Sequence, residues 1–340
     1  NFLLKKKAKI IIISHLGRPQ SKVVKNLRLN PIALWLKKNL CFQANQILLW
    51  ENLRFYSGEK KNNPNFARKL ASLAEIFVND AFAVCHRQHA SIVGIPKFIP
   101  SFAGLRLEKE VKSLKKALSF RKGLVVILGG AKTETKIPII KNLVRLESII
   151  LLGGVVANTF LAAFSSKKKM GGAIIQEKDI KLAKKFLREL DKPVSFSHIP
   201  GKTTKIWLPL DLLIANKQNT PKAVSLIKPY DESIPKDSQV YGLGPKTLKE
   251  YAGLISQAKA IVWNGPVSRA HPKKNPKSTE ELGQAIIRSK AFSVVGGGDT
   301  IATLAKKGIL DKIDLVSTGG GAMLEFLSKG TLPGIEALKR

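Results

Sequence analysis

The chain of 340 residues has few cysteines, few aromatic residues, few acidic residues and no long apolar run. Cys41 and Cys85 form no CxxC motif and cannot build a disulfide framework, so we expect a reducing compartment, the cytoplasm. The longest apolar runs, such as Ile10 to Ile13, stop well short of the roughly 18 to 20 residues of a membrane span. With 44% hydrophobic and 24% charged residues, the sequence predicts a globular protein with two hydrophobic cores and no membrane partner.

Acidic residues are outnumbered, because 58 Lys and Arg stand against 24 Asp and Glu, which gives a formal net charge of +34. Such a charge favours polyanions, so nucleic acid is a candidate partner. The basic residues are mostly lysines in short clusters, without interleaved aromatics, zinc-ligand spacing or an RNP-like motif. A lysine-rich solvated surface is the simpler interpretation, and nucleic-acid binding stays as a secondary alternative.

Short β-branched runs alternate with amphipathic stretches, which is typical of parallel strands joined by crossover helices. The stretch Ser101 to Leu118 has apolar residues at helical spacing and predicts a helix between two halves. The sequence therefore predicts an α/β fold with two doubly wound, Rossmann-like parallel-sheet domains joined by a helix. The expected strands are Ala8–Ser14, Ile47–Trp50, Ile76–Asn79, Leu124–Leu128, Ile149–Leu152, Pro193–Phe196, Leu208–Ile214, Ala260–Trp263, Phe292–Val295 and Asp314–Val316.

An arginine follows each of the first three expected strands, within the motifs SHLGRP, ENLRF and NDAFAVCHRQHAS. Because the carboxyl ends of parallel strands meet at one edge of a sheet, these arginines are expected to converge on an anion. The alternative is that the three arginines lie independently on the surface. His86 and His89 could also be a pair of metal ligands, although the sequence places no third ligand near them. The residues expected to line the anion pocket are His15, Leu16, Gly17, Arg18, Arg54 and Arg87.

Glycine clusters mark the strand ends of the second half, at GGAK, LGG, GGGDT and TGGG. Lys132 and Lys136 are four residues apart after the first cluster, so backbone NH groups and two ammonium groups can face one anion. One glycine pair alone would indicate only a tight turn. Four such junctions predict helix N-termini directed at a polyphosphate, with Asp299 available for Mg²⁺.

Several common motifs are missing from the sequence. There is no GxGxxG, no Walker A spacing, no GxSxG and no HExxH. Hydride transfer, acyl-serine chemistry and zinc-dependent peptide hydrolysis therefore have no support in the sequence.

Taken together, the motifs resemble those of the phosphoglycerate kinase family. The similarity runs in order along the whole chain, through SHLGRP, LLWENLRF, VNDAFAVCHRQHAS, LGGAKTETKI, LLGGVVANTFL, LPLDLLIA, GPKT, VWNGP, VVGGGDT and STGGGAMLEFL. The resemblance implies a glycolytic enzyme that moves a phosphoryl group between 1,3-bisphosphoglycerate and ADP, giving 3-phosphoglycerate and ATP, with Mg²⁺. It also implies a phosphoglycerate-binding domain over 1–104 completed by 331–340, a helix over 105–118, and a nucleotide-binding domain over 119–330.

The resemblance assigns roles to individual residues. The phosphoglycerate site maps onto the anion pocket named above. Lys132 would face the migrating phosphoryl group, Lys136 would hold nucleotide phosphate and Asp299 would contact the metal. The residues assigned to catalysis are Lys132, Arg54, Gly298 and Gly320. The residues assigned to the nucleotide are Gly130, Lys132, Lys136, Gly153, Asn264, Pro266, Gly296, Gly297, Gly298, Asp299 and Thr300.

Two parts of the sequence depart from the family pattern. The strand that precedes SHLGRP in the family is absent, so we expect that the chain lacks its natural beginning and that neighbouring strands are exposed. Val267 to His271 replace the family's MGVFE, so His271 cannot act as its carboxylate, and Val240 replaces a glycine expected near the adenine. A catalytically impaired relative that binds polyanions, and a nucleotide enzyme of another reaction class, stay as alternatives. We expect a monomer.

Overall fold

The computed structural model describes residues 2–43, 46–146, 148–164, 170–190, 206–216, 218, 222–225, 234–270 and 277–339. The chain divides into two compact units, residues Asn1–Leu107 with Leu332–Arg340, and residues Glu108–Thr331. The expected strand Pro193–Phe196 and the departure at His271 lie outside the described residues. Within the described part, no helix is long and apolar enough to cross a membrane.

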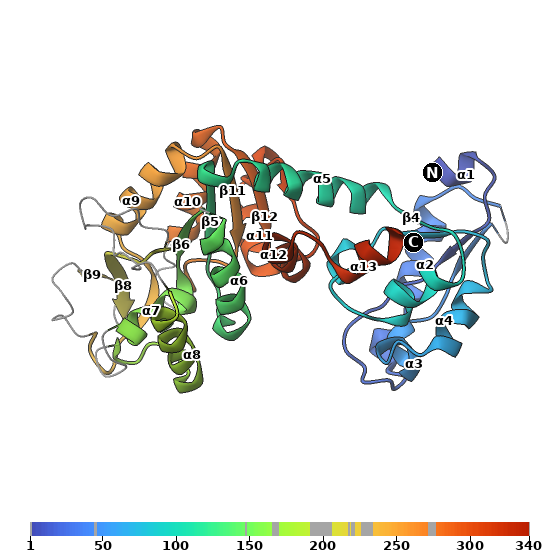
Figure 1. The fold of residues 1–340 in the computed structure, drawn as a ribbon, viewed down its shortest axis with the longest axis horizontal. Helices are drawn as coiled ribbons and strands as arrows, with labels where there is room; N and C mark the ends of the chain where they lie inside the picture. Colours follow the sequence, from blue (N-terminus) through green and yellow to red (C-terminus); the bar gives the residue numbers. More distant parts are fainter. Residues whose placement is uncertain are drawn as a thin grey trace. The chain divides into compact units, whose positions relative to one another are not determined.

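The first unit contains two small parallel sheets (Figure 1). Strand β1 (Ile10–Ile12) pairs with β2 (Ile47–Leu49), and β3 (Phe77–Asn79) pairs with β4 (Ser101–Ala103). The helices of this unit are α1 (Phe2–Lys5), α2 (Asn30–Asn39), α3 (Ser57–Lys60), α4 (Pro64–Ala71) and α13 (Pro333–Glu336), with the short helices η1 (Lys25–Leu27), η2 (Leu53–Phe55), η3 (Phe82–Val84), η4 (Ala90–Gly94), η5 (Ile95–Lys97) and η9 (Ala337–Lys339).

The C-terminal segment belongs to the first unit. Helix α13 contacts η4, and η9 contacts β4, although these elements lie far apart in the sequence (Figure 1). The amide of Gly334 donates to the carbonyl oxygen of Cys85 at 2.8 Å. The hydrophobic core of this unit contains Leu53, Leu70, Ala71 and Ile95. Some strands of this unit carry exposed apolar side chains, such as Leu48 on β2 and Phe102 on β4.

The second unit is built on a six-stranded parallel sheet in the order β13-β12-β11-β5-β6-β7. In order of sequence this is the 3-2-1-4-5-6 arrangement of a doubly wound fold, whose order reverses between β5 and β11. The two central strands are buried along their whole length, because helices cover both faces. The strands are β5 (Leu124–Leu128), β6 (Ile149–Leu152), β7 (Ile206–Trp207), β11 (Ala260–Asn264), β12 (Phe292–Gly296) and β13 (Leu315–Val316).

The second unit is completed by helices, most of which follow strands of this sheet. These are α6 (Thr133–Arg145), α7 (Gly154–Phe164), α8 (Glu177–Arg188), α9 (Pro245–Ser256), α10 (Ser278–Ser289), α11 (Gly298–Ala305) and α12 (Gly320–Lys329), with η6 (Arg121–Gly123) and η8 (Leu310–Lys312). The prediction of a doubly wound α/β fold is confirmed for this unit.

Two local predictions are wrong. The expected parallel strand near residue 210 is β8 (Asp211–Ala215), which runs antiparallel to β9 (Lys222–Ser225) and β10 (Gln239–Leu243), because the short β7 takes the place beside β6. The expected helix from Ser101 begins later, as α5 (Leu105–Ser119), since the preceding residues form β4. The Asp80 carboxylate accepts a hydrogen bond from Leu107 N at 2.9 Å in the first turn of α5.

Candidate functional site

In the first unit, Asn52 fixes the loop that follows β1. Its side-chain amide donates to the carbonyl oxygens of Leu16 and Leu27, both at 2.8 Å. The amide of Leu53 donates to the carbonyl oxygen of Ser14 at 3.0 Å. The loops after β1 and β2 are therefore held together by buried hydrogen bonds, and Asn52 is fully buried between them.

Arg54 is nearly buried beside this loop, at 8% exposed. Its Nη1 donates to the carbonyl oxygen of Gly17 at 2.6 Å, while its buried Nε has no hydrogen-bond partner among the described residues. Burial, followed by the charges of Arg87 and Arg18, lowers the pKa of Arg54. Since like charges at close range are unfavourable, a bound anion would relieve this cost. Arg54, Arg18 and Arg87 therefore form a basic cluster, in which the contact with Gly17 holds Arg54 in place.

His15 belongs to the same cluster. Burial, and then the charge of Arg54, lowers the pKa of His15 to about 4, so its imidazole is neutral at pH 7. The buried Glu59 opposes this effect, and its carboxylate accepts hydrogen bonds from Ser91 N at 3.0 Å and Ser91 Oγ at 2.6 Å. His89 Nδ1 lies 3.6 Å from Glu59 Oε1. The sequence reasoning missed Glu59, because only the folded chain brings it to the histidines.

The other expected residues of this pocket have different surroundings. Leu16 is exposed, and its contact to Asn52 is made by its backbone carbonyl. Gly17 has φ +65°, and a Cβ there would lie 2.7 Å from Leu27 Cδ2, so the turn requires glycine. No group of three His, Cys, Asp or Glu residues among those described could hold a metal ion, which leaves the His86 and His89 pair unsupported.

In the second unit, the loops after β5 and β11 interlock where the strand order reverses. The amide of Gly129 donates to the carbonyl oxygen of Asn264 at 2.9 Å, and that of Gly130 donates to Pro266 at 2.8 Å. Gly265 has φ +92°, and a Cβ there would overlap the Gly129 carbonyl. The crevice at this point is where open α/β sheets bind ligands.

The loops after β12 and β13 join the same network. The amide of Gly265 donates to Thr300 Oγ1 at 2.9 Å, and Asn264 Nδ2 donates to the carbonyl oxygen of Gly320 at 3.2 Å. A Cβ on Gly320 would lie 2.7 Å from the backbone nitrogen of Gly297. Gly320 and Gly297 therefore bring the starts of α12 and α11 together.

Four helices, α6, α7, α11 and α12, begin directly after these glycine loops. Helix N-termini with their positive dipole ends suit phosphate. The amides of Thr133 in α6 and Val155 in α7 already donate to the carbonyl oxygens of Ala131 and Gly130. Gly153 and Gly296 also allow close packing. A Cβ on Gly153 would overlap Val267, and a Cβ on Gly296 would overlap Met323. By contrast, a Cβ on Gly298 meets nothing within 4 Å, so its backbone is accessible.

The two lysines after β5 have different environments. Lys132 is exposed at the N-cap of α6, whereas Lys136 is 6% exposed. A Cβ placed on Gly130 would lie 3.7 Å from Lys136 Nζ, so the ammonium group lies over the first glycine loop. Burial, followed by the charge of Lys132, lowers the pKa of Lys136 to about 8. A phosphate at this loop would supply a counter-charge to Lys136, whose pKa no acidic group among the described residues raises.

Asp299 is exposed in the first turn of α11. One carboxylate beside a phosphate-binding loop fits Mg²⁺, which usually takes one or two carboxylates together with substrate phosphates and water. The donor set therefore fits a metal that arrives with a nucleotide.

Comparison with known proteins identifies the family. The phosphoglycerate kinase family model matches residues 1–330. The phosphoglycerate kinase of Moorella thermoacetica is 38% identical over 360 residues, covering 99% of this chain and 88% of that protein. The chain belongs to the phosphoglycerate kinase family. The enzyme of Finegoldia magna is 36% identical, again with 99% of this chain and 88% of that protein covered.

Solved structures of phosphoglycerate kinases also match. The Coxiella burnetii structure has a TM-score of 0.81 at 34% identity, covering 99% of this chain and 87% of that one. The Pyrococcus horikoshii structure has a TM-score of 0.82 at 29% identity, covering 99% and 88%. The predicted resemblance, the two-domain α/β fold and the phosphotransferase class are confirmed, and no comparison supports the polyanion-binding alternative.

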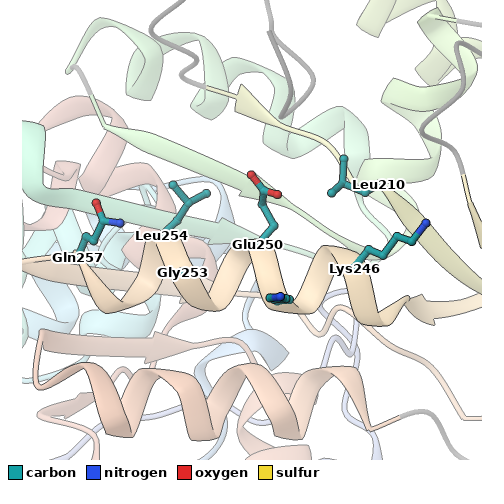
Figure 2. A pocket seen from close by; sticks show the side chains of 7 residues that line it. Leu210, Lys246, Glu250, Gly253, Leu254 and Gln257 are labelled. Carbon is teal, nitrogen blue, oxygen red and sulfur yellow. The ribbon is translucent and has the colours of Figure 1, made fainter. Parts of the chain in front are cut away.

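A separate pocket of about 500 Å³ lies along α9 (Figure 2). It contains none of the residues assigned above to substrate, nucleotide or metal, although Leu210 and Lys246 belong to the motifs LPLDLLIA and GPKT, and it follows the side of a helix instead of the glycine loops. Its lining residues are Leu210, Lys246, Lys249, Glu250, Gly253, Leu254 and Gln257.

Proposed function

We propose that this chain is a phosphoglycerate kinase, which reversibly transfers a phosphoryl group between 1,3-bisphosphoglycerate and ADP to give 3-phosphoglycerate and ATP in glycolysis. The observation that carries the proposal is the interlocked set of glycine loops in the second unit, with buried Lys136 over Gly130. Such a site suits a polyphosphate, and the basic cluster of the first unit suits a smaller phosphorylated carboxylate.

Residues 1–104 with 331–340 would bind the phosphoglycerate. Arg54 and Arg87 would contact its phosphate or carboxylate, because a guanidinium offers a planar pair of donors to either group. His15, Arg18 and the loop at Leu16 and Gly17 would complete this site. This assignment is supported by the buried Nε of Arg54, which has no hydrogen-bond partner in the described part of the chain, and by the charges of Arg87 and Arg18.

Residues 119–330 would bind the nucleotide, and α5 would join the two domains. Lys136 would hold nucleotide phosphate, and Asp299 would hold Mg²⁺, which neutralises phosphate charge when bound. The other proposed nucleotide contacts are Gly130, Gly153, Asn264, Pro266, Gly296, Gly297, Gly298 and Thr300.

In the direction of ATP consumption, a carboxylate oxygen of 3-phosphoglycerate would attack the γ-phosphorus in line. The bond between that phosphorus and the β,γ-bridging oxygen breaks, and ADP leaves with the bond's electron pair. Lys132 would stabilise the migrating phosphoryl group, and the backbone NH groups of Gly298 and Gly320 would donate to its oxygens. The attacking carboxylate is already ionised, so positioning replaces a general base.

Small anions are therefore the partners that we propose, together with a monomeric state and a cytoplasmic location. Nucleic acid stays a secondary candidate on the net charge of +34 alone.

The test is a coupled assay of MgATP consumption that depends on 3-phosphoglycerate. We expect activity in the wild type, a loss of at least about 100-fold in Lys132→Ala, and little change in Lys306→Ala. Lys306 is an exposed lysine at the opposite end of α11, so it controls for charge. A folded wild type without 3-phosphoglycerate-dependent turnover, but with salt-dependent RNA binding that Lys132→Ala leaves intact, would favour the polyanion-binding alternative.

A further inference from the structure

In the second unit, an arginine that stacks on a tyrosine lies three residues beyond Pro266 of the loop after β11. The Arg269 guanidinium carbon lies 4.7 Å from the ring centroid of Tyr241, and Arg269 N donates to the Tyr241 carbonyl oxygen at 2.8 Å. Two independent contacts therefore fix this pair. The proposed transfer reaction gives it no role.

A bulge in β10 sets the direction of Tyr241. In the pairing with β8, Val240 is opposite Ile214 and Gly242 is opposite Leu213, so Tyr241 is the extra residue. Bulges of this kind redirect a side chain and often occur near active sites. The Tyr241 ring is buried, whereas Arg269 is exposed. The ring thus supports the guanidinium, whose donors remain accessible.

The pair lies within reach of a nucleotide whose phosphates occupy the glycine loops. Arg269 follows Pro266 by three residues, so their Cα atoms are at most roughly 10 Å apart. The chain between them is fixed, because Val267 packs on Gly153 and the amide of Ser268 donates to Thr279 Oγ1 at 3.1 Å. A ribose with its phosphates spans about this distance, so the pair is within reach of the base of a nucleotide bound at the glycine loops.

We propose that Tyr241 and Arg269 form a base-selecting platform that favours guanine nucleotides over adenine nucleotides; this inference rests on the proposed kinase function. A guanidinium has donors and no acceptor. Guanine presents two acceptors, O6 and N7, on one edge, whereas adenine presents N7 beside a donating amino group. Arginine donors therefore match guanine at two points and meet a repulsive donor on adenine.

The experiment measures kcat/KM for MgGTP and MgATP with 3-phosphoglycerate. In the wild type we expect GTP to be at least as good a substrate as ATP. Arg269→Ala should lower the GTP to ATP ratio by about fivefold or more, at the low end of a bidentate contact because the site is exposed. Arg288→Ala, an exposed arginine at the far end of α10, should leave the ratio unchanged.

Variants of the tyrosine test the platform itself. Tyr241→Leu removes the ring and should move the ratio in the same direction as Arg269→Ala, whereas Tyr241→Phe keeps the ring and should preserve it. Equal losses with both nucleotides in Arg269→Ala would show a phosphate contact and overturn the proposal. An unchanged ratio would overturn it as well.

Calorimetric titration with MgGDP and MgADP separates this inference from the proposed function. Preferential GDP binding that Arg269→Ala abolishes, without any turnover, would support the platform and contradict the kinase. Turnover with no preference for guanine would support the kinase and contradict the platform. Failure of both diphosphates to bind would contradict both.

Discussion

Arg54 Nη1 donates to the backbone carbonyl oxygen of Gly17 at 2.6 Å, which ties a charged side chain after β2 to the loop after β1. The guanidinium is thereby fixed before any anion arrives, and preorganised donors of this kind are those that contribute most to charge stabilisation.

Removing Arg54 should weaken catalysis more than it weakens the fold. We expect Arg54→Lys to lower kcat/KM by about 10- to 100-fold, the cost of losing a charged hydrogen bond, because lysine cannot keep both the Gly17 contact and the anion. Steady-state kinetics on a variant with a native circular dichroism spectrum checks this. Arg68→Ala, whose guanidinium lies over Phe98, is the matched control and should stay near wild type.

We predict that buried Lys136 destabilises the folded protein and is necessary for nucleotide binding. Its pKa is lowered to about 8 by burial, and this shift corresponds to roughly 3 kcal/mol of destabilisation at pH 7. We expect Lys136→Met to raise the free energy of unfolding by about 1–3 kcal/mol and to abolish nucleotide binding. Urea denaturation measures the first effect. Lys132→Met, at an exposed position, should change the free energy of unfolding by less than about 0.5 kcal/mol. Equal changes in Lys132→Met and Lys136→Met would contradict a destabilising effect of burying Lys136.

Nucleotide affinity should fall as the pH rises through 8. Phosphate binds the protonated form of Lys136, so affinity is retained below its pKa of about 8 and lost above it. Titration calorimetry with MgADP between pH 7 and 9.5 measures this. In Lys136→Arg the side chain stays charged from pH 7 to 9.5, so the pH dependence of MgADP affinity should disappear. A variant that retains the wild-type pH profile would show that another group titrates.

His15 should make the protein less stable in acid. Its pKa in the folded state, about 4, lies below the unfolded value of 6.5, so the unfolded state takes up the proton first. Stability is therefore lost as the pH falls from 6.5 to 4. Urea midpoints at pH 7 and 4.5 should differ less in His15→Gln than in the wild type. An identical difference would mean that His15 does not carry the effect.

Gly320 should not tolerate a side chain. A Cβ there would lie 2.7 Å from both Asn264 Nδ2 and the Gly297 nitrogen, whereas one on Gly321 meets nothing within 4 Å. We expect Gly320→Ala to cost about 1–3 kcal/mol of stability by overpacking, and to lower kcat. Gly321→Ala should be neutral or slightly stabilising, since alanine favours a helix. Thermal unfolding of both variants measures these effects, and equal stability of Gly320→Ala and Gly321→Ala would contradict tight packing at Gly320.

The central strands of the second unit could be predicted from the sequence because they are completely buried and therefore consist of continuous apolar runs. Leu124–Leu128 is a continuous apolar run, and such runs become central strands between two helical layers. The direction of β8 was not predictable in this way. It depends on the two-residue strand β7 occupying the edge of the sheet, and Ile206–Trp207 is too short to carry a period.

The residues of the candidate site also differ in whether a local sequence pattern marks them. Glycine clusters at strand ends carry their own signal, so Gly130 and Gly297 could be singled out from the sequence. Asn52 and Glu59 could not, because each acts through hydrogen bonds to loops more than 20 residues away in the sequence. The depressed pKa of His15 likewise arises from burial and from Arg54, which are properties of the folded chain.

The most direct test of the account is to trap the acyl phosphate. The wild-type protein would be incubated with MgATP, 3-phosphoglycerate and hydroxylamine, which converts an acyl phosphate into a hydroxamate and releases phosphate. We predict that hydroxamate forms in a 1:1 ratio to ADP, that its formation requires 3-phosphoglycerate, and that it is lost in Lys132→Ala. Release of ADP without hydroxamate would contradict it, because the phosphoryl group would then have gone to water.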